Sequence, residues 1–316
     1  MLTKPVALFI FRRPDTTARV FDQVRAAAPQ RLFVVADGPR TAAENGLCSA
    51  TRAVTERVTW DCEVCRLYAD KNLGCGRRVS SGLDWVFSQA EEAIILEDDC
   101  VADMTFFRFC GELLDYYRHE PRVTMISGTS FVPDAAQMGR SYQFSRYALM
   151  WGWATWARAW RSYDFRMTDW PRMRDSGWAE TFFRSSKEAT YWRETLDATA
   201  SGAVDTWDYQ WMFACWLSGG LGVIPNGNLV TNVGFDLRAT HTTGSSNLAN
   251  VPSKRLDFPL LHPGAIEADE FTESRIFKQV FVPGRTPLSV LRAIKHRSRQ
   301  LLSRATTPSA GPVGAG

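Results

Sequence analysis

The sequence has no long apolar run and almost no excess of charge of either sign. No window approaches the roughly 18 uncharged apolar residues of a membrane-spanning helix. Lys and Arg number 37 against 34 Asp and Glu, and a net charge of +3 over 316 residues is too small to indicate a nucleic-acid partner. With 45% hydrophobic residues to build a core, the chain is predicted to be a soluble globular protein.

The sequence also lacks the cysteine pattern of a disulfide framework or of a zinc site. Its seven cysteines are an odd number scattered through expected strands and helices, which is typical of reduced thiols in a cytosolic protein. Cys62 and Cys65 form one CxxC, but no second pair and no nearby histidine completes a zinc site. The stretch MLTKPVALFIFRRPD holds only about seven apolar residues before its double arginine, which predicts a first strand rather than a signal peptide.

What the chain does contain is an alternation of strand-like and helix-like segments over its first hundred residues. Asp15 is placed to cap the first of the helices. Short loops between alternating elements predict a parallel, doubly wound α/β sheet with right-handed crossovers. The expected strands are 5–11, 31–38, 62–70 and 92–99, and the expected helices are 15–28, a stretch of about 16 residues before the third strand, and 79–90.

The fourth of these strands ends in three consecutive acids, Glu97, Asp98 and Asp99. Clustered like charges repel one another and resist burial, so acids at the end of a buried strand indicate a cation site. In an extended strand Glu97 and Asp99 share a face and Asp98 points to the other. Asp99, at the tip, is the expected ligand of Mg²⁺ or Mn²⁺. The alternative is a solvated strand end before a helix that Asp103 caps.

Tryptophan is concentrated in the second half of the chain, where residues 151–216 hold ten of the twelve. The tryptophans of segment 153–160 are spaced i, i+3 and i+7, which predicts a shared helix face. Two uses stay open: packing of the core, or presentation of flat faces to a sugar ring. The candidates for sugar contact are Trp151, Trp153 and Trp207.

Two later segments carry separate expectations. Residues 237–253 are polar, small and turn-rich, and predict a loop that can move. Residues 287–305 predict a basic amphipathic helix, which either lies on an anionic membrane surface or docks on the domain as a solvated C-terminal helix. The tail 306–316 is expected to be disordered.

The stretch AIILEDDCVADMTFFRFCGELLDYY resembles the metal-binding acidic motif of GT-A glycosyltransferases. It looks most similar to the N-acetylglucosaminyltransferase I family and to related bacterial glycosyltransferase-2-like proteins. The similarity extends from about Val6 to His241. It implies the α/β GT-A fold, a Rossmann-like, mostly parallel sheet flanked by helices, with a Trp-rich acceptor-side half. The expected divisions are 1–130 for the nucleotide-sugar half, 131–265 for the acceptor-binding and catalytic half, 266–305 for a helical basic extension and 306–316 for the tail.

The resemblance also assigns nucleotide-binding and metal-binding roles. LFIFRRPD resembles the family's first strand and the basic turn whose arginine lies against the nucleotide base, and FVVADG resembles a second strand ending in an acid that hydrogen-bonds the base. KNLGCGRR resembles the loop before the helix that leads to the acidic motif. The residues implied are Arg12 or Arg13 and Asp37 for the base, Arg77, Glu97, Asp98 and Arg238 elsewhere on the nucleotide, and Asp99 with His241 for the metal.

VDTWDYQWM resembles the Trp-Asp-Asp-Trp-Met segment that carries the family's catalytic base. The match is imperfect, because Asp208 is followed by Tyr209 where the family has two adjacent acids. Asp208 is therefore the expected base, with Asp205 as the reserve. The bland alternative is that Asp205 caps the next helix with Asp208 at its third position. One base without a second nucleophilic carboxylate implies inversion of configuration.

Together these features predict a metal-dependent inverting glycosyltransferase. The expected donor is a nucleotide-diphosphate sugar, with UDP-sugars favoured, and the acceptor is a glycan or lipid-linked glycan of a bacterial surface polysaccharide. Because the chain starts at its first strand, a cytoplasmic enzyme is expected, peripheral to the inner face of the membrane through its basic helix. Two alternatives stay open: a sugar nucleotidyltransferase, although FRRPDTT lacks the glycines of a triphosphate loop, and a non-catalytic carbohydrate-binding protein.

Overall fold

The computed structural model of this chain describes residues 1–131, 139–235 and 248–282. The chain divides into two compact units. Among the described residues, the first unit lies within Met1–Thr168 and Asp205–Val280, and the second comprises Asp169–Val204 with residues 281–282.

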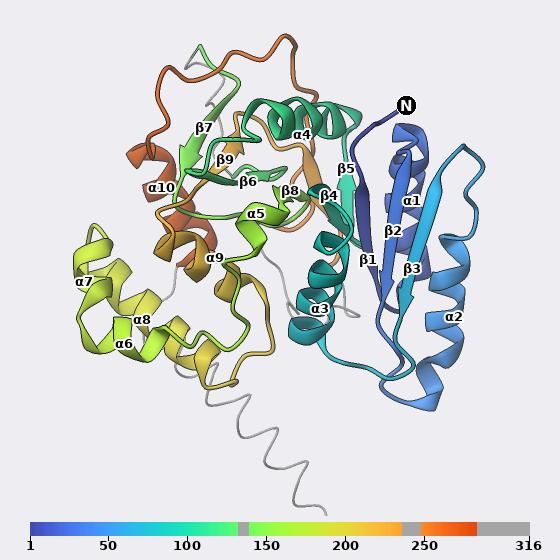
Figure 1. Cartoon of the computed structure of the whole chain (residues 1–316), viewed down its shortest axis with the longest axis horizontal. Coiled ribbons are helices and arrows are strands. Elements are labelled where there is room, and N and C mark those ends of the chain that lie inside the picture. The colour runs from blue at the N-terminus through green and yellow to red at the C-terminus, as the bar shows by residue number, and fades with distance from the viewer. Residues whose placement is uncertain (132–138, 236–247, 283–316) are drawn as a thin grey trace, which may run out of the picture. The chain divides into compact units, whose positions relative to one another are not determined.

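The first unit is built on an eight-stranded sheet of order β3-β2-β1-β4-β8-β6-β9-β7 (Figure 1). Strands β3, β2, β1 and β4 pair in parallel, as do β6 and β9, whereas β8 and β7 run antiparallel to their neighbours. The prediction of a mostly parallel α/β sheet is confirmed. The strands are β1 Val6–Ile10, β2 Arg31–Ala36, β3 Glu63–Tyr68, β4 Glu92–Glu97, β6 Val123–Ser127, β7 Tyr142–Ser145, β8 Trp153–Trp156 and β9 Leu221–Pro225.

Helices connect these strands, and a second sheet of two strands follows the acidic triplet. In that small sheet β5 (Cys100–Ala102) pairs antiparallel with β10 (Val230–Asn232). The helical elements of the first unit are α1 Pro14–Ala27, η1 Ala42–Glu44, α2 Asn45–Val54, α3 Cys75–Phe87, α4 Met104–Tyr116, α5 Ala157–Trp160, α9 Asp208–Leu217 and α10 Glu270–Ile276, and α10 continues into the π-helical turn η3 Phe277–Phe281.

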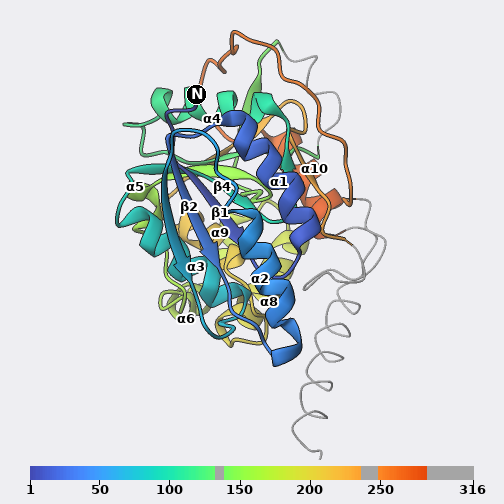
Figure 2. The same ribbon diagram turned by 90° about the vertical axis from the view of Figure 1, so that its right-hand side faces the viewer.

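Helices cover both faces of the parallel strands, because side chains alternate along each strand. On one face Leu8, Val34 and Leu96 are fully buried and join a core with residues of α1, α2 and α4. On the other face Phe9 and Val35 lie against α3. Figure 2 shows α1 and α2 on one side of the strands and α3 on the other. The result is a three-layer arrangement with the sheet in the middle.

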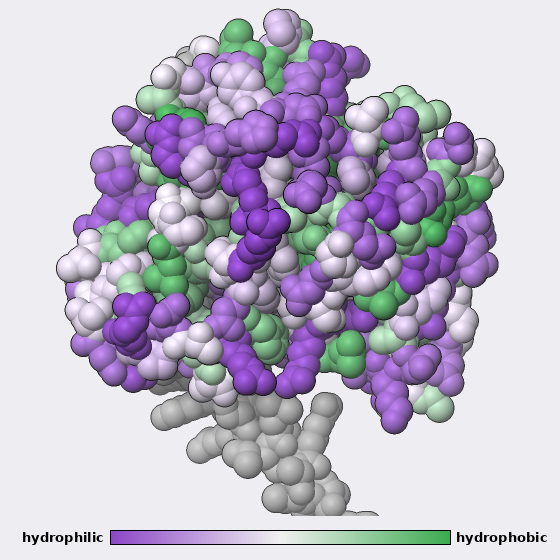
Figure 3. All heavy atoms as spheres, viewed as in Figure 1, coloured by the Kyte–Doolittle hydropathy of each residue, from purple (hydrophilic) through white to green (hydrophobic). Residues whose placement is uncertain are grey.

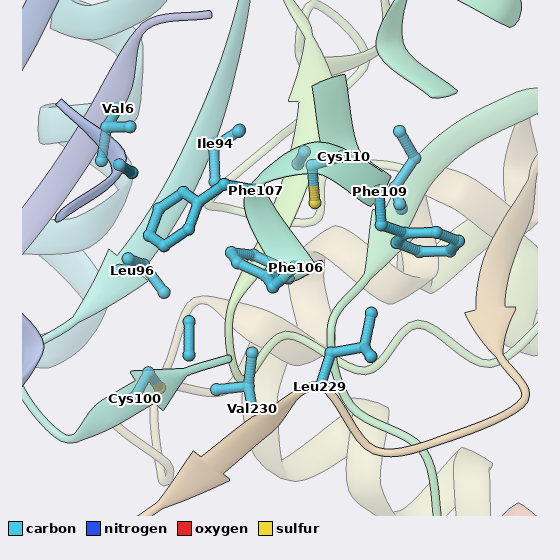
Figure 4. Packing of buried hydrophobic residues seen from close by; sticks show 14 of the residues in the cluster. Val6, Ile94, Leu96, Cys100, Phe106, Phe107, Phe109, Cys110, Leu229 and Val230 are labelled. Carbon is cyan, nitrogen blue, oxygen red and sulfur yellow. The ribbon is translucent and has the colours of Figure 1, made fainter. Parts of the chain in front are cut away.

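Helix α4 supplies the bulkiest part of this core beneath the acidic triplet. Phe106 and Phe107 are buried and lie beside Ile94 and Leu96 of β4 and Val230 of β10 (Figure 4). Burying a side chain of this size contributes about 1.5 to 3 kcal/mol relative to leaving it exposed. This apolar packing fixes the end of β4 from which the acids project.

Two predicted helix starts differ from the structure. Helix α1 begins at Pro14, so Asp15 lies in its first turn and does not cap it. Proline is favoured at the first helical position because its missing N–H would have no partner there. Helix α3 begins at Cys75 rather than at residue 79, so residues 75–78 of the segment KNLGCGRR form its first turn and residues 71–74 precede it. The predicted cap of α4 is confirmed, because Asp103 Oδ1 accepts from Thr105 N at 2.8 Å.

The predicted tryptophan helix over 153–160 is wrong for its first half. Residues Trp153–Trp156 form strand β8, which pairs antiparallel with β4 on one side and with β6 on the other. All four residues are buried. A short apolar run buried on both faces carries no periodicity that separates strand from helix, and two flanking strands satisfy its backbone groups.

The described residues of the second unit form the helices α6 (Trp170–Asp175), α7 (Trp178–Phe182) and α8 (Ser186–Ala200). Ser185 caps α8 by accepting from Glu188 N at 3.2 Å. The ring of Trp192 stacks on Phe183 with centroids 6.1 Å apart.

The described part of the chain carries polar and hydrophobic residues interspersed on the face drawn in Figure 3. None of the helices in residues 1–131, 139–235 and 248–282 combines the length and hydrophobicity that crossing a bilayer requires. The seven cysteines, all of which are described, are free, which agrees with the expectation of reduced thiols.

Substitution of Gly82 tests the close contact between α3 and the sheet. A Cβ there would lie 2.6 Å from Phe9 and 2.7 Å from Val35, whereas a Cβ at Gly46 of α2 would meet nothing within 4 Å. We expect Gly82→Ala to lower the free energy of unfolding, because overpacking costs about 1 to 3 kcal/mol against about 1 kcal/mol of helix propensity gained. Gly46→Ala should raise it by about 0.5 to 1 kcal/mol. Urea unfolding of both variants measures the difference, and equal effects would contradict the packing.

Candidate functional site

The candidate site lies at the carboxyl edge of the parallel strands. In the sheet register Ile10 of β1 pairs with Ala36 of β2, and Phe9 pairs with Glu97 of β4. The segments that follow these three strands therefore leave the sheet at the same edge. This is where open α/β sheets bind ligands. The segments carry the arginine pair, Asp37 and the acidic triplet.

Arg13 is the cation that balances part of the triplet. Its Nη2 donates to Asp98 Oδ1 and, at 2.8 Å, to Asp99 Oδ2. Asp98 Oδ2 also accepts from Phe11 N at 3.1 Å. Burial lowers the pKa of Arg13, but the charges of Asp98 and Asp99 outweigh it and raise that pKa overall. In this structure Arg13 thus binds two of the acids, whereas the sequence led us to expect it against a nucleotide base.

Glu97 is the last residue of β4, and Asp98 and Asp99 lie in the turn that follows it, where the sequence led us to expect the strand to continue to Asp99. In the described residues no Lys or Arg forms an ion pair with Glu97. Burial raises the pKa of the Glu97 carboxyl to about 8, and the charges of Asp99 and Asp98 add to the shift. Burial likewise raises the pKa of Asp98, and Arg13 opposes that rise. The edge therefore holds more negative charge than its arginine neutralises.

Asp208, distant in sequence, lies near this charge. It is the first residue of α9, and its Oδ1 accepts from the hydroxyl of Thr206 and, at 2.8 Å, from Tyr209 N. Its charge is among those that raise the pKa of Glu97. The fold therefore brings the predicted base to the predicted metal-binding acids.

The contacts of Asp205 differ from both expectations, which were a reserve base and a cap of the following helix. It does not cap α9, whose N-cap residue is Trp207. Its two oxygens accept from the backbone of α3, from Cys75 N at 3.2 Å and Gly76 N at 3.0 Å. Asp205 therefore supplies a cap to another helix, and its role as reserve base stays a prediction.

Cys75 is a site residue that sequence reasoning missed. Burial raises the pKa of its thiol, and the charges of Glu97, Asp208, Asp205 and Asp99 raise it further. The side chain is thus close to four carboxylates and stays protonated at neutral pH. The only sequence signal was its position between two glycines, Gly74 and Gly76, at what proves to be the start of α3.

Asp37 and Arg12, two other expected nucleotide contacts, have partners within the protein. Asp37 is buried, and accepts from Gly38 N at 2.8 Å, Leu73 N at 2.9 Å and Asn72 Nδ2 at 2.8 Å. Burial raises its pKa and these backbone bonds lower it. Its carboxylate fastens the loop that precedes α3. Arg12 forms an ion pair with Glu44 at 3.1 Å, and Arg77 is exposed on the first turn of α3.

Two of the three tryptophans expected to contact an acceptor are buried. Trp153 is 0% and Trp207 3% exposed, and their rings stack with centroids 5.5 Å apart. Their expected role as sugar-contact residues is corrected to packing, because neither presents a ring face to solvent. Trp151 is partly exposed and lies edge-on to Phe131 and Phe235.

Arg238 and His241 lie outside the described residues, as do residues 237–247 of the loop predicted over 237–253 and the basic helix predicted over 287–305. Residues 233 and 234, shortly before that loop, contact Asp99. Val233 N donates to the backbone oxygen of Asp99 at 2.9 Å, and a Cβ on Gly234 would fall 2.0 Å from Asp99 Oδ2. Only a glycine allows the backbone to pass this close.

The donor set fits a hard divalent cation. Mg²⁺ and Mn²⁺ prefer carboxylate oxygens and are usually held by one or two of them, with phosphate oxygens and water completing the shell. Asp99 and Glu97 supply such oxygens, and the uncompensated charge at this edge favours a cation. No group of three His, Cys, Asp or Glu side chains forms a ready-made metal cage in the described residues. A cation here would therefore depend on oxygens from its ligand.

The charge surplus predicts an unusual pH dependence of stability. The pKa of Glu97 is raised on folding, so the unfolded chain ionises at about pH 4.5 while the folded protein keeps the proton until about pH 8, and stability is lost as pH rises between these values. We expect Glu97→Gln to have a higher free energy of unfolding than the wild type. The margin between the two should grow over this range by up to about 1.4 kcal/mol per pH unit. Calorimetry without metal measures this margin.

Glu56→Gln, at an exposed glutamate, is the matched control and should show no such trend. Millimolar Mn²⁺ should stabilise the wild type most at high pH and Glu97→Gln much less. A margin that stays constant with pH would contradict the assignment of the surplus charge to Glu97.

No protein-family model matches the chain, and no curated protein matches it. Among solved structures, UDP-glucose pyrophosphorylase complexed with UDP-glucose is similar over 47% of this chain and 64% of that chain, with 12% sequence identity and a TM-score of 0.27. The aligned region spans less than two thirds of that enzyme. A TM-score this low carries no conclusion, so the fold assignment rests on the strand order and pairing of the chain itself.

Proposed function

We propose that this protein is a metal-dependent, inverting glycosyltransferase of GT-A type. It would move a sugar from a nucleotide-diphosphate donor, a UDP-sugar foremost, to a hydroxyl of a glycan or lipid-linked glycan of a bacterial surface polysaccharide. The observation that carries this proposal is the proximity of Asp208 to Glu97 at the carboxyl edge of the sheet. Glycosyl transfer needs a place for the diphosphate and, beside it, an acceptor for a proton.

The acids at the end of β4 have distinct roles in the proposal. A divalent cation held by Asp99 would neutralise the charge that develops on the leaving diphosphate. Arg13 keeps Asp98 and Asp99 in place through the hydrogen bonds that its Nη2 donates. Arg77, exposed at the start of α3, is available to the diphosphate.

Asp208 is the proposed general base. Its Oδ1 is occupied by Thr206 and Tyr209, and in the described residues no hydrogen bond reaches Oδ2. Oδ2 would take the proton of the acceptor hydroxyl while that oxygen bonds to the anomeric carbon and the bond to the diphosphate oxygen breaks. One such displacement inverts the configuration. Trp151, partly exposed, is the remaining candidate for acceptor contact.

A thermal-shift panel tests donor binding. We expect one of UDP, GDP, dTDP and CMP to raise the unfolding temperature of the wild type only when Mn²⁺ is present, because ligands that bind the folded state stabilise it. Asp99→Ala should lose this shift. Asp175→Ala, at an exposed acid of the second unit, is the control and should keep it. A shift that persists in the presence of chelator, or in Asp99→Ala, would contradict the proposed metal site.

A second experiment tests the base and the reaction class. Asp208→Asn should keep the metal-dependent nucleotide shift. Its transfer rate should fall by a factor of about 10² to 10⁴, because the substitution removes general-base catalysis. Release of nucleoside diphosphate, and the anomeric configuration of the product by NMR, measure transfer. Release of pyrophosphate from a nucleoside triphosphate would replace the proposal with nucleotidyl transfer. Glycan binding in chelator without nucleotide affinity would replace it with carbohydrate binding.

A further inference from the structure

The side chain of Asp205 caps the N-terminus of α3, which lies far from it in sequence. The first N–H groups of a helix have no partner within it and usually receive one from the side chain of the N-cap residue. The N-cap residue of α3 is Gly74, which has no side chain to offer. Asp205 supplies the missing acceptors, with Oδ2 on Cys75 N and Oδ1 on Gly76 N. Its negative charge also suits the positive end of the helix dipole.

The two glycines that flank Cys75 leave the space for this approach. A Cβ on Gly76 would lie 2.6 Å from the carbonyl oxygen of Thr206 and 2.9 Å from Asp205 Oδ1. A Cβ on Gly74 would lie 2.7 Å from Asp205 Oδ2, and its φ of +82° also favours glycine. The start of α3 is thus shaped to receive the Asp205–Thr206 peptide, which a capping role alone would not require.

Hydrogen bonds continue from Asp205 to Asp208. The Thr206 hydroxyl donates to Asp208 Oδ1, and the carbonyl oxygen of Thr206 accepts from Gln210 Nε2 at 2.8 Å. The carbonyl oxygen of Trp207 accepts from the Tyr163 hydroxyl at 3.3 Å. Every residue from Asp205 to Asp208 is therefore held by at least one of these bonds, and the anchor at α3 bears on the orientation of Asp208.

We propose that Asp205 is a positioning residue that holds Asp208 against the acidic triplet by fixing the 205–208 turn to the start of α3. The inference rests on the proposed function in that Asp208 is the base. A purely structural cap would affect stability alone. A positioning residue affects the rate of the chemical step as well, because a displacement of about 1 Å in a reacting group costs about 100-fold.

The first test compares Asp205→Ala with Asp205→Asn, which keeps one carbonyl oxygen able to accept a backbone N–H. We expect Asp205→Ala to lower kcat about 100-fold with the donor KM and the nucleotide shift with Mn²⁺ nearly unchanged, and Asp205→Asn to recover part of the loss. Ser185→Ala, which removes the cap of α8 in the second unit, should lower Tm by about 2 to 4 °C without changing kcat. An Asp205→Ala variant that behaves like Ser185→Ala overturns the proposal.

The second test needs no turnover. The N–H of Tyr209 donates to Asp208 Oδ1, so its hydrogen exchange reports on the Asp208 carboxylate. We expect Asp205→Ala to speed exchange at Tyr209 as well as at Cys75 and Gly76. Faster exchange at the start of α3 alone would overturn the positioning role. If the wild type neither binds nucleotide with metal nor transfers sugar, the proposed function fails, while this exchange result still decides whether Asp205 positions Asp208.

Discussion

The site depends on an imbalance of charge at the end of β4. Three consecutive acids meet one partly buried arginine, and Arg13 bonds Asp98 and Asp99, while in the described residues Glu97 forms no ion pair with a cation. Burial, and after it the like charges of Asp99 and Asp98, raise the pKa of Glu97. A cation is the simplest chemical means of relieving this repulsion, and it would also give the edge an affinity for a diphosphate.

Apolar packing on the sheet holds the strand end that carries this charge. Phe106 and Phe107 of α4 pack in one core with the apolar residues of β4 as far as Leu96, the residue before the acids. In the turn after β4, Asp98 and Asp99 bond Arg13 just before the start of α1, while Glu97, the last residue of β4, lies near Cys75 at the start of α3. Two helix starts and one strand end thus meet at one edge, each bringing polar groups that its own element leaves unpaired.

Asp205 and Asp208 show how one short segment serves both faces of this arrangement. Asp205 completes the start of α3, and Asp208 opens α9 with one oxygen fixed by Thr206 and Tyr209. Acids at helix starts are ordinary, because the helix dipole favours them there. What is specific to this chain is that the two starts are joined by a three-residue step, so a structural contact and a candidate catalytic contact depend on each other.

By itself the sequence determined the alternation of strands and helices, the strand that ends in the acidic triplet and the cap at Asp103, because these follow from local periodicity and local hydrogen bonding. It misplaced β8, because a short apolar run pairs according to its neighbours, and it misplaced the start of α3, because the acceptors for that start come from Asp205. Only the tertiary structure decided that Arg13 balances the triplet, that Trp153 and Trp207 are buried, and that Cys75 and Asp208 lie near Glu97. Contacts between residues far apart in the chain are set by packing and charge across elements, which no local pattern encodes.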